Sequence, residues 1–92
     1  MYVYILKCVD DSYYTGVARD PQERVIRHNE GSGADYTKRR RPLKLVYLEK
    51  LENKQQAEQR ERQIKKLSVK NKERLIQLGS GQGFPSPLEI QW

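Results

Sequence analysis

The alternation of hydrophobic and polar positions predicts three strands in the first half of the chain. Residues 2–9 form a nearly continuous apolar run with β-branched and aromatic members, which is typical of a strand covered on both faces. Residues 10–12 are a turn signal, and residues 13–17 read as a second strand. We therefore expect an antiparallel hairpin. A third strand is predicted over residues 43–50.

The first predicted helix has recognisable signals at both of its ends. Asp20 suits the N-cap, Pro21 suits the first helical position, and Glu23 can complete a capping box. Gly31 can supply the left-handed residue that ends the helix.

Two more helices are predicted after the third strand. Asn53 can cap the first of them, with Gln56 at its third position, and this helix runs to about Leu67. Ser68 can cap the second, which ends near residue 79.

These elements predict one small domain over residues 1–79. Their order is β-β-α-β-α-α, which predicts an α/β (α+β) fold with helices packed on a small sheet. Residues 31–42 are expected to be a loop, and the glycine- and proline-rich residues 80–92 an irregular tail.

Charge and cysteine content restrict the class of protein. Lysine and arginine number 18 against 12 acidic residues, and the formal net charge of +6 favours nucleic acid as partner over an anionic membrane surface. The alternative is a basic protein that is merely soluble. Cys8 is the single cysteine, so no intrachain disulfide can form, which fits a reducing compartment. With no signal peptide or membrane span in the sequence, we expect a cytoplasmic location.

Tyr4 and Tyr14 are candidate catalytic residues in the predicted hairpin. Counted back from the turn, they could pair across the two strands. A phenol can donate or accept a proton, so two adjacent tyrosines could assist acid–base chemistry. The alternative is that both rings simply pack in a core.

Arg24 and His28 are four residues apart on the first helix and share one face. An arginine can bind phosphate and stabilise charge in a transition state, and a histidine can move a proton near neutral pH. The alternative is a solvated helix face.

Glu61 occupies an otherwise apolar stripe that includes Ala57 and Ile64. A carboxylate there is costly without a partner. A divalent cation such as Mg²⁺ could be that partner, and an ion pair with one of the chain's many arginines is the alternative.

Basic residues other than Arg24 could contact phosphates without reading the base sequence. The alternative is that they only keep the protein soluble. With one cysteine and one histidine, a zinc site is excluded. The residues concerned are Lys38, Arg39, Arg40 and Arg41 in the expected loop, and Lys65 and Lys66 on the second-last helix.

The chain resembles the GIY-YIG endonuclease domains, especially the small stand-alone bacterial members, over about residues 1–78. The resemblance depends on an ordered set of motifs: Tyr2-Val3-Tyr4, Tyr14-Thr15-Gly16, Arg24, His28 and Glu61. Supporting segments are residues 31–37, 40–42, 45–47 and 64–67. The first triplet departs from Gly-Ile-Tyr, but each triplet keeps its tyrosine.

This resemblance implies a three-stranded antiparallel sheet and hydrolysis of nucleic-acid phosphodiesters with Mg²⁺ or Mn²⁺. DNA is favoured over RNA as substrate, and a separate protein could supply targeting. The resemblance implies roles for six residues: general acid–base groups at Tyr4, Tyr14 and His28, phosphate binding at Arg24, metal binding at Glu61, and nucleic-acid contact at Tyr36. Two alternatives stay open: a non-catalytic nucleic-acid-binding module, and an interaction subunit of a DNA-processing complex.

Overall fold

Three antiparallel strands form a single sheet in the order β2-β1-β3. The computed structural model describes residues 1–33 and 35–79, so the predicted tail at 80–92 lies outside the described residues. β1 (Tyr2–Lys7) is central, with β2 (Tyr13–Ala18) and β3 (Lys44–Lys50) on its two sides. The predicted hairpin and the three-stranded antiparallel sheet are confirmed.

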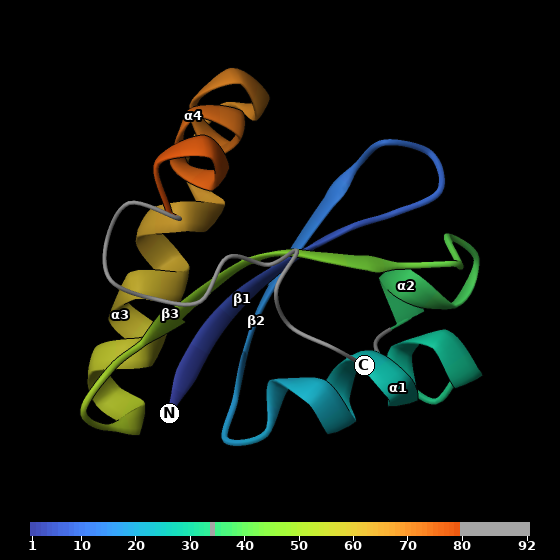
Figure 1. Cartoon of the computed structure of the whole chain (residues 1–92), viewed down its shortest axis with the longest axis horizontal. Helices are drawn as coiled ribbons and strands as arrows, with labels where there is room; N and C mark the ends of the chain where they lie inside the picture. The colour runs from blue at the N-terminus through green and yellow to red at the C-terminus, as the bar shows by residue number, and fades with distance from the viewer. Residues whose placement is uncertain (34, 80–92) are drawn as a thin grey trace.

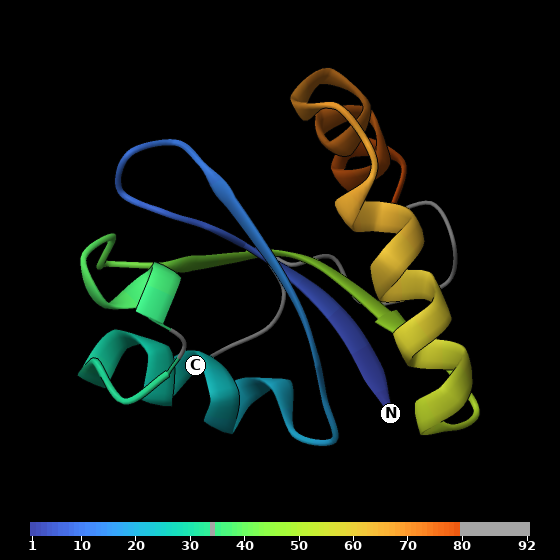
Figure 2. The same ribbon diagram turned by 180° about the vertical axis from the view of Figure 1, so that it is seen from behind.

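The helices cover the two faces of this sheet. In Figures 1 and 2, α1 (Pro21–Glu30) and α2 (Asp35–Lys38) lie on one side, and α3 (Lys54–Lys65) and α4 (Val69–Gly79) lie on the other. The predicted element order is confirmed. The one difference is α2, a single helical turn inside the segment that was predicted to be a loop.

Local capping chemistry starts α1, α3 and α4 and ends α1 as predicted, but the predicted capping boxes are not completed, since Glu23 pairs with Arg27 and Gln56 accepts from the backbone N–H of Glu52. The Asp20 carboxylate accepts a hydrogen bond from the backbone N–H of Glu23 (3.1 Å), and Gly31 ends α1 with a φ of 86°. The side chains of Asn53 and Ser68 make the equivalent bond at the starts of α3 and α4. These bonds satisfy backbone donors that a helix start leaves unpaired.

β1 is buried on both faces, as its continuous apolar run predicted. Tyr4 and Leu6 belong to the core beside α1, whereas Val3 and Ile5 belong to the core beside α3. Alternation along the strand therefore divides its side chains between two small cores.

A β-bulge lets β3 contribute to both of those cores. Leu45 pairs with Leu6, but Tyr47 pairs with Ile5, and the ladder shifts between these two pairs. Leu45 accordingly packs on the α1 side and Tyr47 on the α3 side.

The hairpin register corrects the expected pairing of two tyrosines. Tyr4 pairs with Gly16, and Tyr14 pairs with Leu6, so the tyrosines are diagonal neighbours on one face and do not pair directly. Paired residues of the two strands are equally far from Asp10 along the chain. Direct pairing of Tyr4 with Tyr14 would need them to be equally far from Val9. Diagonal neighbours still lie within reach of aromatic side chains.

Candidate active site

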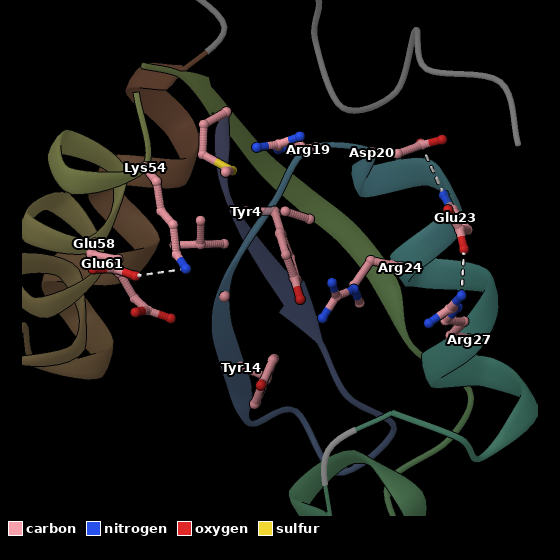
Figure 3. Close-up of a pocket in the computed structure, with 14 residues that line it drawn as sticks. Tyr4, Tyr14, Arg19, Asp20, Glu23, Arg24, Arg27, Lys54, Glu58 and Glu61 are labelled. Atoms are coloured by element: carbon pink, nitrogen blue, oxygen red, sulfur yellow. Dashed lines mark hydrogen bonds and ion pairs between the residues drawn. The ribbon is translucent and has the colours of Figure 1, made fainter. Parts of the chain in front are cut away.

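An open cleft of about 570 Å³ follows the free edge of the sheet, between α1 and α3 (Figure 3). Tyr4 and Tyr14 reach it from the strands, Arg24 from α1, and Glu61 from α3. Because β2 is the outer strand, side chains from both faces of the sheet can meet around its edge. The fold thus brings four of the five predicted catalytic residues to one cavity.

His28, the fifth of these residues, lies behind Tyr4 and is 2% exposed. Its Nε2 is 3.1 Å from the Tyr4 hydroxyl, and its Nδ1 is 2.8 Å from the Thr37 hydroxyl. The Tyr14 ring also contacts the imidazole, with centroids 5.1 Å apart. Both ring nitrogens of His28 therefore have partners, and the imidazole connects Tyr4 to α2.

Thr37 is a site residue that the sequence did not single out as chemical. It is fully buried on α2, beneath the histidine ring. A threonine beside a short glycine-containing stretch carries no signal of this role, because only the tertiary fold brings it to His28.

The protonation of this buried group follows from its surroundings. Burial lowers the pKa of His28 below its ordinary value of 6.5, and the charge of Arg24 acts in the same direction. Burial raises the pKa of the Tyr4 phenol well above its ordinary range, helped by Tyr14 and opposed by Arg24. Near neutral pH, both Tyr4 and His28 are uncharged, so one ring nitrogen of His28 is free to accept a hydrogen bond.

Gly16 makes room for the Tyr4 ring. A Cβ atom at Gly16 would collide with the Tyr4 hydroxyl and would lie 2.6 Å from its Cζ. The side chain opposite Tyr4 in the ladder must therefore be absent for the phenol to occupy this position.

Arg24 is the cation whose charge acts on the pKa of both Tyr4 and His28. Within the described residues, its guanidinium forms no ion pair. By contrast, Arg27 on the same helix is paired with Glu23 at 2.8 Å. The Arg24 guanidinium can therefore interact with an anion bound in the cleft.

Glu61 lies at the edge of the apolar stripe of α3. Ala57 and Ile64 on that stripe are fully buried, whereas the Glu61 side chain is 22% exposed and lines the cleft. One of its oxygens is 3.4 Å from Lys65 Nζ, so an ion pair partly compensates its charge. Within the described residues, the basic partner of Glu61 is thus a lysine of the same helix, where an arginine was the alternative expected from the sequence.

The donor set fits a metal held mainly by substrate and water. Within residues 1–33 and 35–79, no three His, Cys, Asp or Glu side chains cluster as metal ligands. Mg²⁺ commonly takes one or two carboxylates and completes its coordination with waters and phosphate oxygens. Glu61 can supply such a carboxylate from the cleft wall.

Two of the predicted nucleic-acid-binding arginines make bonds within the protein. Arg40 donates to Asp10 (3.1 Å) and to the Tyr36 carbonyl (2.8 Å), and its guanidinium covers the Tyr36 ring at 3.9 Å. Arg41 donates to the carbonyl of Asn29 (3.2 Å). These arginines fasten the segment after α1 to the rest of the domain.

Other predicted phosphate contacts are exposed. Lys38 pairs with Asp35 at 3.2 Å, and Arg39 is exposed beside it. Lys65 and Lys66 are exposed at the end of α3, on the other side of the cleft. Basic side chains therefore lie on both sides of the sheet edge.

Comparison with known proteins agrees with this arrangement. A family model described as the GIY-YIG catalytic domain matches residues 1–74. A UPF0213 protein of Staphylococcus saprophyticus is 51% identical over 78 residues, covering 85% of this chain and 95% of its own. A UPF0213 protein of Clostridium perfringens is 53% identical over 75 residues, covering 82% and 81% respectively.

Two structures determined in solution by NMR are also similar. A UPF0213 protein from Bacillus halodurans has a TM-score of 0.56 and 42% identity, covering 88% of this chain and 86% of its own. A protein from E. faecalis has a TM-score of 0.62 and 36% identity, covering 91% and 90%.

The chain therefore belongs to the GIY-YIG catalytic-domain family. Its relatives named above place it beside the UPF0213 proteins, a small stand-alone bacterial branch of that family. Membership supports a nuclease-type role and nucleic-acid binding, and GIY-YIG nucleases generally use divalent metal ions. None of the helices in the described residues is both long and apolar enough to span a membrane.

Proposed function

We propose that this protein is a metal-dependent endonuclease that hydrolyses nucleic-acid phosphodiester bonds. The observation that carries the proposal is the meeting of Tyr4, Arg24 and Glu61, from three different elements, in one cleft of a domain with a net charge of +6. A proton-transfer group, a cation for the phosphate and a carboxylate for a metal are the groups that such hydrolysis needs.

Glu61 is the residue that would hold the divalent ion, Mg²⁺ or Mn²⁺. When bound, that ion supplies charge stabilisation on the phosphate oxygens, including the leaving 3′ oxygen. The Glu61 carboxylate lines the cleft and lies 3.4 Å from Lys65 Nζ.

Tyr4 and His28 would move the proton from the attacking water. This step needs the tautomer of neutral His28 in which Nε2, 3.1 Å from the Tyr4 hydroxyl, accepts its hydrogen and Nδ1–H donates to the Thr37 hydroxyl at 2.8 Å. As water attacks phosphorus, its proton passes to the Tyr4 oxygen and the Tyr4 proton passes to Nε2. The tyrosine thereby stays uncharged, in keeping with the raised pKa of its phenol.

Arg24 would stabilise the negative charge that develops on the pentavalent phosphorus. Tyr14 contributes to the same site by packing against His28 and lining the cleft. We further propose that Tyr36, Lys38, Arg39, Lys65 and Lys66 contact the substrate, that DNA is favoured over RNA, and that a separate protein supplies targeting in the cytoplasm.

The test is cleavage of labelled single-stranded, duplex and branched DNA, and of RNA, in Mg²⁺, Mn²⁺ or EDTA. Glu61→Gln and Arg24→Ala should each lower the rate by about 10²–10³-fold, because each removes charge stabilisation from the transition state. The Glu61→Gln variant should still bind the nucleic acid.

Matched controls lie on the same helices. Glu58→Gln removes a cleft carboxylate one turn before Glu61, and Arg27→Ala removes the paired arginine one turn after Arg24. Both should keep most of the activity. Binding to every substrate without metal-dependent cleavage, unchanged by Glu61→Gln, would instead establish a non-catalytic nucleic-acid-binding module.

A further inference from the structure

A second recess, of about 220 Å³, lies beside the cleft at the α2 and α4 end of the β2 edge. The two cavities share Tyr14 as a lining residue, so they are neighbours along β2. The residues that line this recess are Tyr13, Tyr14, Thr15, Tyr36, Lys65 and Lys72.

The charge of this recess suits an anion. Lys65 from α3 and Lys72 from α4 are its only charged lining residues in the described part of the chain. Lys65 also contacts Glu61 of the cleft at 3.4 Å, so this lysine stands between the two sites. Two lysines that line one small cavity can bind a phosphate without recognising its substituents.

A buried hydroxyl in the recess wall also calls for a polar partner. Thr15 is 3% exposed, and its Oγ1 has no hydrogen-bond partner among the described residues. A buried hydroxyl without a partner destabilises the fold relative to a satisfied one, whereas valine would fill the same volume without that cost. The threonine hydroxyl is explained if a ligand in the recess bonds to it.

The third feature is an exposed aromatic ring. Tyr36 is 40% exposed, and it lies nearly parallel to Tyr14, with centroids 6.1 Å apart and an angle of 28° between the rings. The Arg40 guanidinium covers the Tyr36 ring and donates a hydrogen bond to the Tyr36 backbone carbonyl, and both contacts keep Tyr36 in place. Aromatic rings in a basic groove are the usual surface against which nucleobases pack.

We infer that this recess is a nucleotide subsite that binds the unit next to the scissile phosphate. Lys65 and Lys72 hold its phosphate, Tyr36 and Tyr14 contact its base, and the Thr15 hydroxyl bonds to its sugar or base. This inference rests on the proposed function for the identity of the neighbouring site. It places the substrate strand along the β2 edge, from the cleft toward α2.

Binding without catalysis tests the inference. Thymidine 5′-monophosphate is titrated into the ¹⁵N-labelled whole chain in EDTA and followed by NMR. Saturable shifts are expected at Thr15, Tyr36 and Lys72. Thymidine alone and inorganic phosphate alone should each bind more weakly, because each engages only part of the recess.

Matched variants separate the subsite from general charge. Lys72→Gln should weaken binding by about fivefold, equivalent to the loss of one ordinary hydrogen bond. Thr15→Val should weaken it about threefold without loss of stability. Lys50→Gln removes the same charge from the far strand of the sheet and should have no effect.

Two results would overturn the subsite: shifts confined to the surroundings of Arg24 and Glu61, or an equal loss of affinity in Lys72→Gln and Lys50→Gln. Binding in the recess by a protein that cleaves nothing would keep the subsite and reject the proposed hydrolysis.

Discussion

His28 illustrates what a single residue's sequence context shows and what it hides. Its spacing from Arg24 placed both on one helix, and the structure brings both near Tyr4. Its burial and its bond to Thr37 were not predictable, because they depend on α2 folding over the ring. The direct pairing of Tyr4 with Tyr14 was also predicted wrongly from the sequence, because a shift of one residue in the turn changes every cross-strand partner.

The burial of His28 predicts a pH-dependent stability. The pKa of His28 is lower in the folded protein than the ordinary value of 6.5 that applies to the unfolded chain. At a pH between these two values, the unfolded chain therefore binds a proton that the folded chain does not. The free energy of unfolding should therefore fall as pH drops below 6.5, by at most about 1.4 kcal/mol per pH unit, and this contribution should be flat above 6.5. Urea denaturation between about pH 5.5 and 7.5 measures the effect.

His28→Gln is the control, because glutamine cannot take up this proton yet can hydrogen-bond to Tyr4 and Thr37. Its stability should be flat over the same range. The chain has one histidine, so NMR of its ring can follow the titration in the native protein without ambiguity. A ring pKa at or above 6.5 would contradict the prediction.

Secondary-structure elements were predictable where local chemistry defines them. The caps of α1, α3 and α4 are hydrogen bonds between residues three apart, so the sequence alone contains them. The one-turn helix α2 was missed because long-range contacts hold it, including those of Thr37 to His28 and of Arg40 to Asp10. The bulge in β3 was missed for a similar reason, since two cores fix its register.

β2 can be tested as the element that supports Tyr4, the proposed catalytic tyrosine. Gly16→Ala should displace the Tyr4 ring, because the added methyl would overlap it. We expect a loss of about 1–3 kcal/mol in the free energy of unfolding. We also expect a loss of about tenfold or more in cleavage rate under conditions where the variant stays folded.

Val46→Ala on β3 is a suitable comparison for Gly16→Ala. Val46 is a half-buried residue of the core beside α3, on the strand farthest from the cleft. It should lose about 1 kcal/mol of stability and keep its cleavage rate. If Gly16→Ala retained full activity, close contact between β2 and Tyr4 would not matter for catalysis.

The charge of the whole molecule overstates the number of side chains available to a phosphate backbone. The sequence predicted a basic surface correctly, but Arg40 and Arg41 bond to the protein's own carbonyl groups. Composition cannot distinguish an arginine that fastens a loop from one that faces solvent, because the difference is tertiary. The exposed lysines on both sides of the cleft are the better candidates for substrate contact.

Nucleic-acid binding should therefore depend strongly on salt, but less than 18 basic residues would suggest. For about three to five phosphates neutralised, log Kobs should fall with log salt at a slope of about −2 to −4. Fluorescence anisotropy in EDTA, over a series of KCl concentrations, measures this slope. Lys66→Gln should make it shallower by about 0.7–0.9, the value for one contact. A flat dependence, with a salt-insensitive protein complex instead, would favour an interaction subunit.

The position of the cleft at a sheet edge has a consequence for how the protein is made. The ribosome releases β1, β2 and α1 first, and with them Tyr4, Tyr14, Arg24 and His28. Glu61 follows only on α3, near the end of the domain, after both strands that flank β1 have been synthesised. A nascent chain therefore lacks the proposed metal-binding carboxylate until the second layer of helices docks. Competence for cleavage would arrive together with completion of the fold.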